Sequence, residues 1–281
     1  MGASTSGHGD GPGDDTTGPT APVDGPVTRR LFGFDFIDDA GVDATVERIL
    51  GPQPDDGRLP LVATPNVDQL VRLEEPGLSD LHAFVTRARY VLPDGQPIVW
   101  ASRLLRRPLT ARLPGSTLVP PIWRRAAAEH LPVVVVASTD EIAERLGAEH
   151  PGASFVVPPF YDAEDQGAAA AIADEVAEAV RTSAPRLVFV GVGFPKRERL
   201  ALDLLDRLDP TIDAPLVLLI GAAFSMYLDI TPRAPEWMQR AGLEWFYRFI
   251  LEPRRLFRRY FITDAKFARI VARELRADRR R

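Results

Sequence analysis

The segment Pro132-Val-Val-Val-Val-Ala137 is an uninterrupted apolar run in the middle of the chain. Four consecutive valines with no polar residue between them are typical of a strand that is buried on both faces of a parallel sheet. Similar apolar runs recur along the chain, with helical segments between them. The predicted strands are 132–137, 153–157, 186–191 and 215–221, and the predicted helices are 140–150, 166–182 and 195–208. This alternation predicts an α/β fold with a Rossmann-like parallel sheet and helices on both faces.

The residues before this region continue the pattern. Phe32, Phe34 and Phe36 alternate with glycine and aspartate, so residues 30–37 are predicted to form one strand with an apolar face. Further strands are predicted at 61–63 and 90–92, and further helices at 42–50, 67–73, 78–87, 98–106 and 116–129. In the helix at 98–106, the residues expected to point inward are Ile98, Trp100, Ala101, Leu104 and Leu105.

Charge and composition divide the chain into three parts. Residues 1–28 are mostly Gly, Ser, Thr, Pro and Asp and are predicted to be a disordered tail. Residues 29–232 form the α/β domain, and 233–281 form a basic amphipathic helical appendage. The net charge is −5 overall, but the appendage has 14 Lys/Arg against 6 Asp/Glu, so its net charge is +8 and the remainder carries −13. A basic segment on an acidic body indicates that the segment contacts an anionic partner.

Several classes of protein are excluded by composition. The chain has no cysteine, which rules out disulfides, thiolate metal sites and a cysteine nucleophile. The four histidines have no metal-ligand spacing, so no metal is expected. No apolar run reaches the roughly 18 residues of a membrane-spanning helix, and no signal peptide is expected. We therefore expect a cytoplasmic protein, peripheral to the inner face of the plasma membrane.

The segment Arg233–Tyr260 has aromatic and aliphatic residues at helical spacing, with arginines between them. One interpretation is a helical cap whose aromatic residues fill the core. A second is an amphipathic surface that binds anionic lipid. The arginines would also suit a diphosphate, because a guanidinium group binds phosphate oxygens in a bidentate manner. The candidates for this role are Arg233, Arg240 and Arg248.

Polar residues follow four of the predicted strands, where ligands bind in an open α/β sheet. Thr64 and Asn66 follow the strand at 61–63, and they could cap a helix or bind a sugar or uracil. Asp94-Gly95 follows the strand at 90–92 and is either a turn or a general base at the crevice.

Glycines follow the other two strands. Gly191-Val-Gly193 is either a tight turn or a phosphate-binding loop at a helix N-terminus. The last strand leads into Gly221-Ala-Ala-Phe224.

These motifs together resemble a known family. In order along the chain they are Thr64-Pro-Asn66, Pro93-Asp94-Gly95 before Val99-Trp100, Arg112-Leu-Pro-Gly115, Gly191-x-Gly193-x-Pro195-Lys196-x-Glu198, Gly221-Ala-Ala-Phe224 and Arg233-Ala-Pro235-x-Trp237-Met238. Over about residues 30–262 the chain closely resembles the WecG/TagA/CpsF family of bacterial glycosyltransferases (glycosyltransferase family 26). Several blocks in the same order are far more specific than any one of them.

The resemblance implies an inverting glycosyltransferase that needs no metal and no cofactor. Its donor would be a UDP-sugar of the N-acetylmannosamine type, and its acceptor a sugar on a polyprenyl diphosphate, for teichoic acid, capsule or a related polysaccharide. It implies that Asp94 is the base and that Thr64, Asn66 and Arg112 bind substrate. Gly95, Gly191, Gly193, Lys196, Arg197 and Glu198 belong to the same substrate-binding blocks. The C-terminal segment would face an anionic membrane and supply arginines to the diphosphates.

The chain departs from the family pattern at two positions. Arg197 stands where the family usually has Gln, and Thr117 stands where an acid is frequent after the Arg112 block. An extra cation at Arg197 would suit an acidic sugar such as a uronate.

Other classes of function stay open. A non-catalytic nucleotide-sugar-binding or membrane scaffold protein is the main alternative, and a homo-oligomer is compatible with the sequence. Nucleic-acid binding is not expected, because the body is acidic and no nucleic-acid motif is present.

Overall fold

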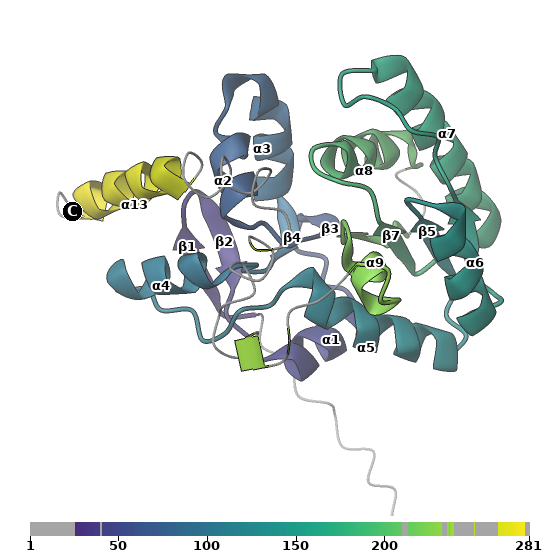
Figure 1. Ribbon diagram of the computed structural model, residues 1–281, viewed down its shortest axis with the longest axis horizontal. Helices are drawn as coiled ribbons and strands as arrows, with labels where there is room; N and C mark the ends of the chain where they lie inside the picture. Colours follow the sequence, from purple (N-terminus) through teal and green to yellow (C-terminus); the bar gives the residue numbers. More distant parts are fainter. Residues whose placement is uncertain are drawn as a thin grey trace, which may run out of the picture.

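The computed structural model describes residues 26–39, 41–209, 213–231, 235, 237–238, 250 and 264–278. Within these ranges, eight strands form one sheet in the order β1-β2-β4-β3-β8-β7-β5-β6 (Figure 1). The strands are β1 (Thr28–Leu31), β2 (Phe34–Ile37), β3 (Leu59–Ala63), β4 (Ala88–Val91), β5 (Val133–Val136), β6 (Ser154–Val156), β7 (Leu187–Val190) and β8 (Leu216–Leu219). β1 is antiparallel to β2 and all other neighbouring strands are parallel. The predicted α/β fold is therefore confirmed.

Helices connect the strands. They are α1 (Val42–Leu50), α2 (Val67–Leu73), the 3-10 turn η1 (Pro76–Leu78), α3 (Ser79–Thr86), α4 (Gln96–Leu104), α5 (Gly115–Ala128), α6 (Asp140–Glu149), α7 (Gln166–Ser183), α8 (Lys196–Arg207), α9 (Ala223–Tyr227) and α13 (Asp264–Asp278). The predicted disordered tail lies outside the described residues up to position 25, as does most of the predicted appendage between 232 and 263.

Each central strand contributes to two cores. Along β5, Val134 and Val136 pack on one face of the sheet, whereas Val133 and Val135 pack on the other. The first face is covered by α2, α3, α7 and α8, and the second by α1, α5, α6 and α9 (Figure 1). Successive strand residues point to opposite faces, so burial on both sides requires an apolar residue at every position. This is why the valine run is uninterrupted.

The predicted single strand at 30–37 is wrong. It is a hairpin in which β1 and β2 pair with Leu31 opposite Phe34. Phe32 and Gly33 form the two-residue turn, with φ angles of 54° and 85°. Positive φ at both positions is what a tight hairpin of the primed type requires. Phenylalanine is unusual there, because a bulky side chain disfavours the left-handed region.

The helix α13 holds this turn in place. Phe32 is buried, and its ring packs edge-on against Phe267 with the centroids 5.2 Å apart. Its backbone N–H donates to Glu274 Oε2 at 2.7 Å. Ile270 and Val271, on the same side of α13, belong to the core that includes α2. Tertiary contacts from the last helix therefore stabilise a turn that local preference disfavours.

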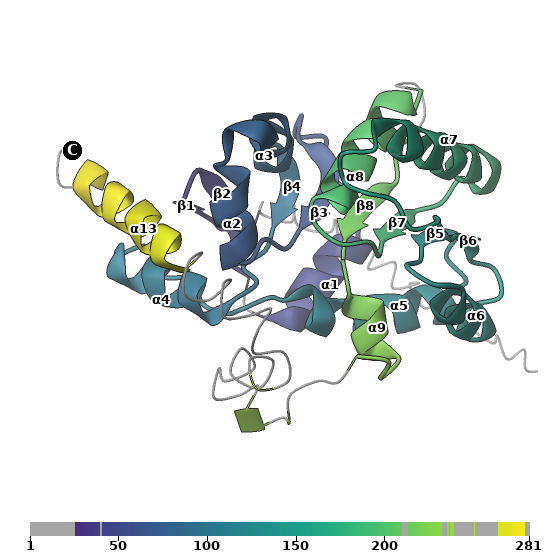
Figure 2. The same ribbon diagram turned by 45° about the horizontal axis from the view of Figure 1, so that its top comes forward.

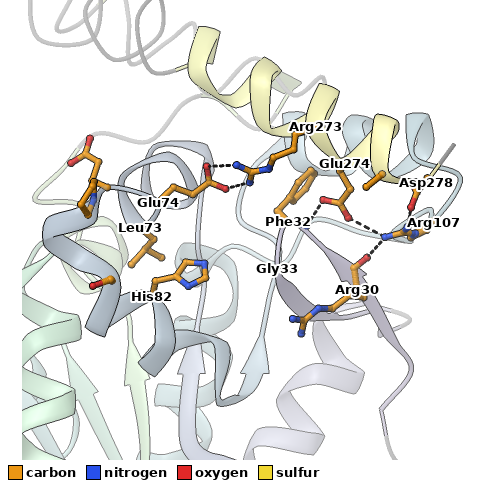
Figure 3. A pocket seen from close by; sticks show the side chains of 14 residues that line it. Arg30, Phe32, Gly33, Leu73, Glu74, His82, Arg107, Arg273, Glu274 and Asp278 are labelled. Atoms are coloured by element: carbon orange, nitrogen blue, oxygen red, sulfur yellow. Dashed lines mark hydrogen bonds and ion pairs between the residues drawn. The ribbon is translucent and has the colours of Figure 1, made fainter. Parts of the chain in front are cut away.

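Ion pairs surround a hollow of about 720 Å³ between the hairpin turn, α3 and α13 (Figure 3). Arg107 pairs with Glu274 at 3.0 Å and with Asp278, and it also donates to the Arg30 carbonyl at 2.8 Å. Arg273 of α13 pairs with Glu74 at 3.1 Å. The turn lies at the amino end of β2, so this hollow is at the opposite edge of the sheet from the carboxyl ends of the parallel strands.

The helix α4 also differs from expectation. Ile98, Ala101 and Leu105 are buried as predicted, but Trp100 is 54% exposed and Leu104 is 60% exposed. The five residues predicted to point inward are all apolar and recur at helical spacing. However, only one side of the helix packs against another part of the fold. Trp100 and Leu104 were therefore wrongly assigned to the core.

We expect Arg107→Ala to loosen α13 from the hairpin. The substitution removes two partly buried ion pairs and a charged hydrogen bond, so it should lower local stability by about 2 kcal/mol. Hydrogen exchange of the α13 amides should then quicken by roughly 30-fold at that cost.

Arg181→Ala is the matched control, because Arg181 is exposed and its ion pair among the described residues is with Glu178 on the same helix. An exposed pair of this kind contributes roughly 0–1 kcal/mol. Equal exchange rates in α13 for Arg107→Ala and Arg181→Ala would show that the ion pairs do not hold this helix.

Candidate active site

The carboxyl ends of β4, β3, β8 and β7 lie at one edge of the sheet, because these four strands are neighbours and parallel (Figure 2). Each strand ends at one of the predicted site segments. Residues 64–66 follow β3, residues 93–95 follow β4, Gly191 follows β7, and Gly221 lies two residues beyond β8. The pairing of β3 with β8 brings the two halves of the chain together at this edge.

Backbone hydrogen bonds join residues 64–66, residues 93–95 and the loop that carries Arg112. The N–H of Asp94 donates to the Pro65 carbonyl at 3.3 Å, and the N–H of Leu113 donates to the Pro93 carbonyl at 2.8 Å. These bonds place the loop that carries Arg112 beside Asp94, and both beside Thr64 and Asn66. The structure therefore brings together five residues that the sequence assigned to the site: Thr64, Asn66, Asp94, Gly95 and Arg112.

Asn66 caps the helix α2. Its Oδ1 accepts from the Gln69 N–H at 3.2 Å, and Gln69 Oε1 accepts from the Asn66 N–H at 3.0 Å. The capping interpretation is thus confirmed. The cap uses the carbonyl oxygen of the Asn66 side chain and not its amide N–H groups, which are the atoms that could donate to a ligand.

Thr64 is almost fully buried at the end of β3. A Cβ on Gly115 would lie 3.5 Å from Thr64 Oγ1 and 3.8 Å from the Ile220 carbonyl. Both are ordinary contact distances, and Gly115 is the first residue of α5, so the N-terminus of that helix lies next to the ends of β3 and β8. Backbone N–H groups at a helix N-terminus favour an anion.

Asp94 and Gly95 connect β4 to α4. Gly95 has φ of 147° and is the N-cap residue of α4, a conformation that L side chains rarely adopt. The Asp94 side chain is half-buried at the edge of the sheet. The same dipeptide is thus both the turn that starts a helix and a carboxylate at the crevice.

The glycines after β7 have different roles. A Cβ on Gly191 would lie 2.7 Å from the Val136 carbonyl, and its N–H already donates to that carbonyl at 2.8 Å. Close approach of β7 to β5 therefore accounts for Gly191, and its N–H is not available to a phosphate. Gly193 is exposed, and a Cβ there would meet no atom within 4 Å.

Lys196 is held by a loop that sequence reasoning did not assign to the site. Its ammonium donates to the Tyr161 carbonyl and lies 4.8 Å from the Phe160 ring centroid and 4.4 Å from that of Tyr161. Burial raises the pKa of the Tyr161 hydroxyl, as does the negative charge of Asp203. The loop after β6 is thus fixed to the first residue of α8. No residue pattern in the loop marks this cation–π contact in advance.

Arg197 and Glu198 form a buried ion pair. Arg197 is 6% exposed, Glu198 is 3% exposed, and Arg197 Nε donates to Glu198 Oε1 at 2.7 Å. A Cβ on Gly221 would lie 2.8 Å from Arg197 Nη1, so glycine at 221 leaves room for the guanidinium. Among the described residues, Glu198 Oε2 is buried without a hydrogen-bond partner. The ion pair with Glu198 compensates the positive charge of Arg197 within the protein.

The remaining predicted arginines cannot be placed. Arg233, Arg240 and Arg248 lie outside the described residues, and their contribution to the site stays a prediction. In the described part of the chain, no group of three or more His, Asp or Glu side chains could hold a metal ion.

The family model for the WecG/TagA/CpsF glycosyl transferases matches residues 29–281, which is nearly the whole chain. The chain belongs to this family. Similar proteins include the N-acetylglucosaminyldiphosphoundecaprenol N-acetyl-beta-D-mannosaminyltransferases of Staphylococcus aureus strains NCTC 8325 / PS 47, COL and MRSA252. Each is 27% identical over 177 residues, which cover 61% of this chain. The match spans 65% of the length of these curated relatives.

Membership of the WecG/TagA/CpsF family confirms the resemblance inferred from the ordered motifs. The matched region contains all the strand-end segments described above. In this family member, Arg197 is packed into the protein in the first turn of α8. We therefore expect its removal to act first on stability.

Arg197→Gln should lower the free energy of unfolding by roughly 3 kcal/mol, because it leaves the Glu198 carboxylate buried without a counter-charge. The double variant Arg197→Gln/Glu198→Gln should recover most of that loss, since neither remaining side chain is charged. Urea denaturation of both variants measures the difference. A single variant as stable as the double variant would contradict the buried-pair account.

Proposed function

We propose that this protein is an inverting glycosyltransferase. It transfers a sugar of the N-acetylmannosamine type, or a related hexose, from a UDP-sugar to a sugar on a polyprenyl diphosphate. The observation that carries the proposal is the backbone-bonded cluster of Thr64–Asn66, Pro93–Gly95 and Arg112–Leu113 at the carboxyl edge of the sheet. Family membership and the names of the similar proteins support the reaction class and the lipid-linked acceptor.

Asp94 acts as the general base in this proposal. Its carboxylate accepts the proton of the acceptor hydroxyl as that oxygen attacks the anomeric carbon from the face opposite UDP. The bond between the anomeric carbon and the diphosphate oxygen breaks at the same time, and its electron pair leaves with UDP. One displacement of this kind inverts the anomeric centre.

The leaving diphosphate requires positive charge and N–H donors. Arg112 lies in the loop that is bonded beside Asp94, and the N-terminus of α5 approaches the same edge. Both would stabilise the charge that develops on the diphosphate. We assign Arg233, Arg240 and Arg248 to the same task, with the C-terminal segment closing over the crevice.

The buried ion pair bears on the choice of donor sugar. A uronate would need an uncompensated cation, but the charge of Arg197 is neutralised by Glu198 at 2.7 Å. This favours a neutral sugar over an acidic one. The similar proteins are named as N-acetyl-beta-D-mannosaminyltransferases, which agrees with that preference.

We propose that the reaction takes place at the inner face of the plasma membrane, with the basic C-terminal segment contacting anionic lipid. None of the described helices is long and apolar enough to cross a bilayer. The products would enter cell-surface polysaccharides such as teichoic acid or capsule. The alternative is a protein that binds nucleotide sugars at the membrane without catalysis.

Asp94→Asn separates these two functions. The amide cannot accept the acceptor proton, so transfer should fall by roughly 100- to 10,000-fold, whereas the affinity for the UDP-sugar should stay within about threefold. The assay uses UDP-N-acetylmannosamine and a short-chain polyprenyl-diphosphate N-acetylglucosamine, with product detected by mass spectrometry and donor binding measured by calorimetry.

Asp140→Asn is the matched control, because Asp140 is an exposed aspartate at the start of α6, which follows β5 and not one of the four strands that end at the site segments. It should transfer as the unmodified protein does. Donor binding without transfer in the unmodified protein would favour the non-catalytic alternative, and full transfer by Asp94→Asn would exclude Asp94 as the base.

Activity should persist in EDTA. The proposed charge stabilisation comes from arginines and N–H donors, so removing divalent ions should change the rate by less than about twofold. Loss of transfer in EDTA that manganese restores would show that a metal takes part.

A further inference from the structure

The helix α4 presents large apolar side chains to solvent. Trp100 and Leu104 are 54% and 60% exposed, and they lie one helical turn apart on the same side. The opposite side of the helix, including Ile98 and Ala101, is buried in the fold. Such a pair on one stripe of a helix is unlike a single apolar residue scattered on a surface, and it indicates a partner.

Two arginines lie close to this pair. Arg103 and Arg106 are exposed, and neither side chain forms an ion pair or hydrogen bond in the part of the chain that the structure describes. Arg107, one residue further on, is instead bound to α13. We call Trp100, Arg103, Leu104 and Arg106 the α4 outer face. Its chemistry, an apolar stripe beside exposed arginines, is that of an interfacial helix.

The position of α4 connects this face to the proposed reaction. The helix begins directly after Asp94-Gly95, so it leads away from the candidate base. In both views α13 lies beside α4 (Figures 1 and 2). The helix α13 adds exposed cations along one stripe, among them Arg269 and Arg276. Arg103 and Arg106 thus place positive charge beside the apolar stripe, in a protein whose net charge is −5.

We propose that the α4 outer face is a lipid-docking surface. Trp100 and Leu104 insert at the boundary between headgroups and acyl chains, and Arg103 and Arg106 bind lipid phosphates. The inference rests on the proposed function in one respect: a lipid-linked acceptor requires the protein to reach a membrane surface. Charge complementarity favours an anionic bilayer over a second copy of this acidic chain as the occupant.

Vesicle binding by the full chain tests the proposal without any use of transfer activity. The vesicles are phosphatidylcholine, with and without phosphatidylglycerol, and binding is measured by sedimentation. Trp100→Ser/Leu104→Ser should weaken binding by about tenfold or more, since two large apolar side chains no longer leave water. Phe160→Ser is the matched control, because Phe160 is an aromatic residue that is 92% exposed in the loop after β6. This variant should change vesicle binding by less than about twofold.

The arginines are tested separately. Arg103→Ser/Arg106→Ser should remove most of the preference for phosphatidylglycerol, by about tenfold or more at low salt, and should change binding to pure phosphatidylcholine little. Thermal unfolding and circular dichroism establish that each variant is folded. Brominated lipids should quench Trp100 fluorescence, so Trp100→Phe should lose a large part of the quenching.

Each contrary result identifies a different occupant and overturns the proposal. Unchanged vesicle binding together with a change from dimer to monomer in Trp100→Ser/Leu104→Ser would assign the face to a second copy. Unchanged binding together with a lower melting temperature would assign it to another segment of this chain. In either case transfer to a short, water-soluble acceptor would still report on the proposed function independently.

Discussion

Burial of the central strands on both faces is the constraint on which the rest of the molecule depends. Strands β5, β7 and β8 are apolar at every position, and their alternate side chains enter two separate cores. Both cores need helices to cover them, and crossover helices such as α8, between β7 and β8, let neighbouring strands run parallel. The carboxyl ends then meet at one edge. The candidate site is therefore a consequence of how the sheet is covered, and the loops supply only its chemistry.

The fold could be predicted where the pattern is local. The strand β5 lies within the predicted strand 132–137 and the helix at Val67–Leu73 has the predicted bounds, because burial and capping by Asn66 depend on neighbouring residues. The hairpin could not be predicted, because Phe32 adopts its positive φ through contact with Phe267, which is distant in the sequence. Trp100 and Leu104 were misplaced for a similar reason. Periodicity identifies apolar residues, but it does not say whether another element lies opposite them.

The candidate site, like the fold, could be predicted from the sequence only in part. Thr64, Asn66, Asp94 and Arg112 could be found from strand ends and ordered motifs, since parallel strands bring those ends together. The interaction partners of individual side chains could not be found from the sequence. Arg197 looked like an extra cation for substrate, yet the adjacent Glu198 neutralises it in a buried pair. The rings of Phe160 and Tyr161 around Lys196 come from a loop with no motif. Such contacts depend on side-chain geometry, which sequence spacing does not determine.

The contact between the hairpin turn and α13 has a consequence for how the protein is made. Phe32 and Glu274 are 242 positions apart, so a ribosome completes the sheet long before it releases the helix that covers the turn. During that interval the nascent chain exposes an apolar surface and a strained turn at the edge of an otherwise finished fold. Exposed surface of this kind favours aggregation and recruits chaperones. A chain that ends before Asp264–Asp278 therefore cannot cover its own Phe32–Gly33 turn.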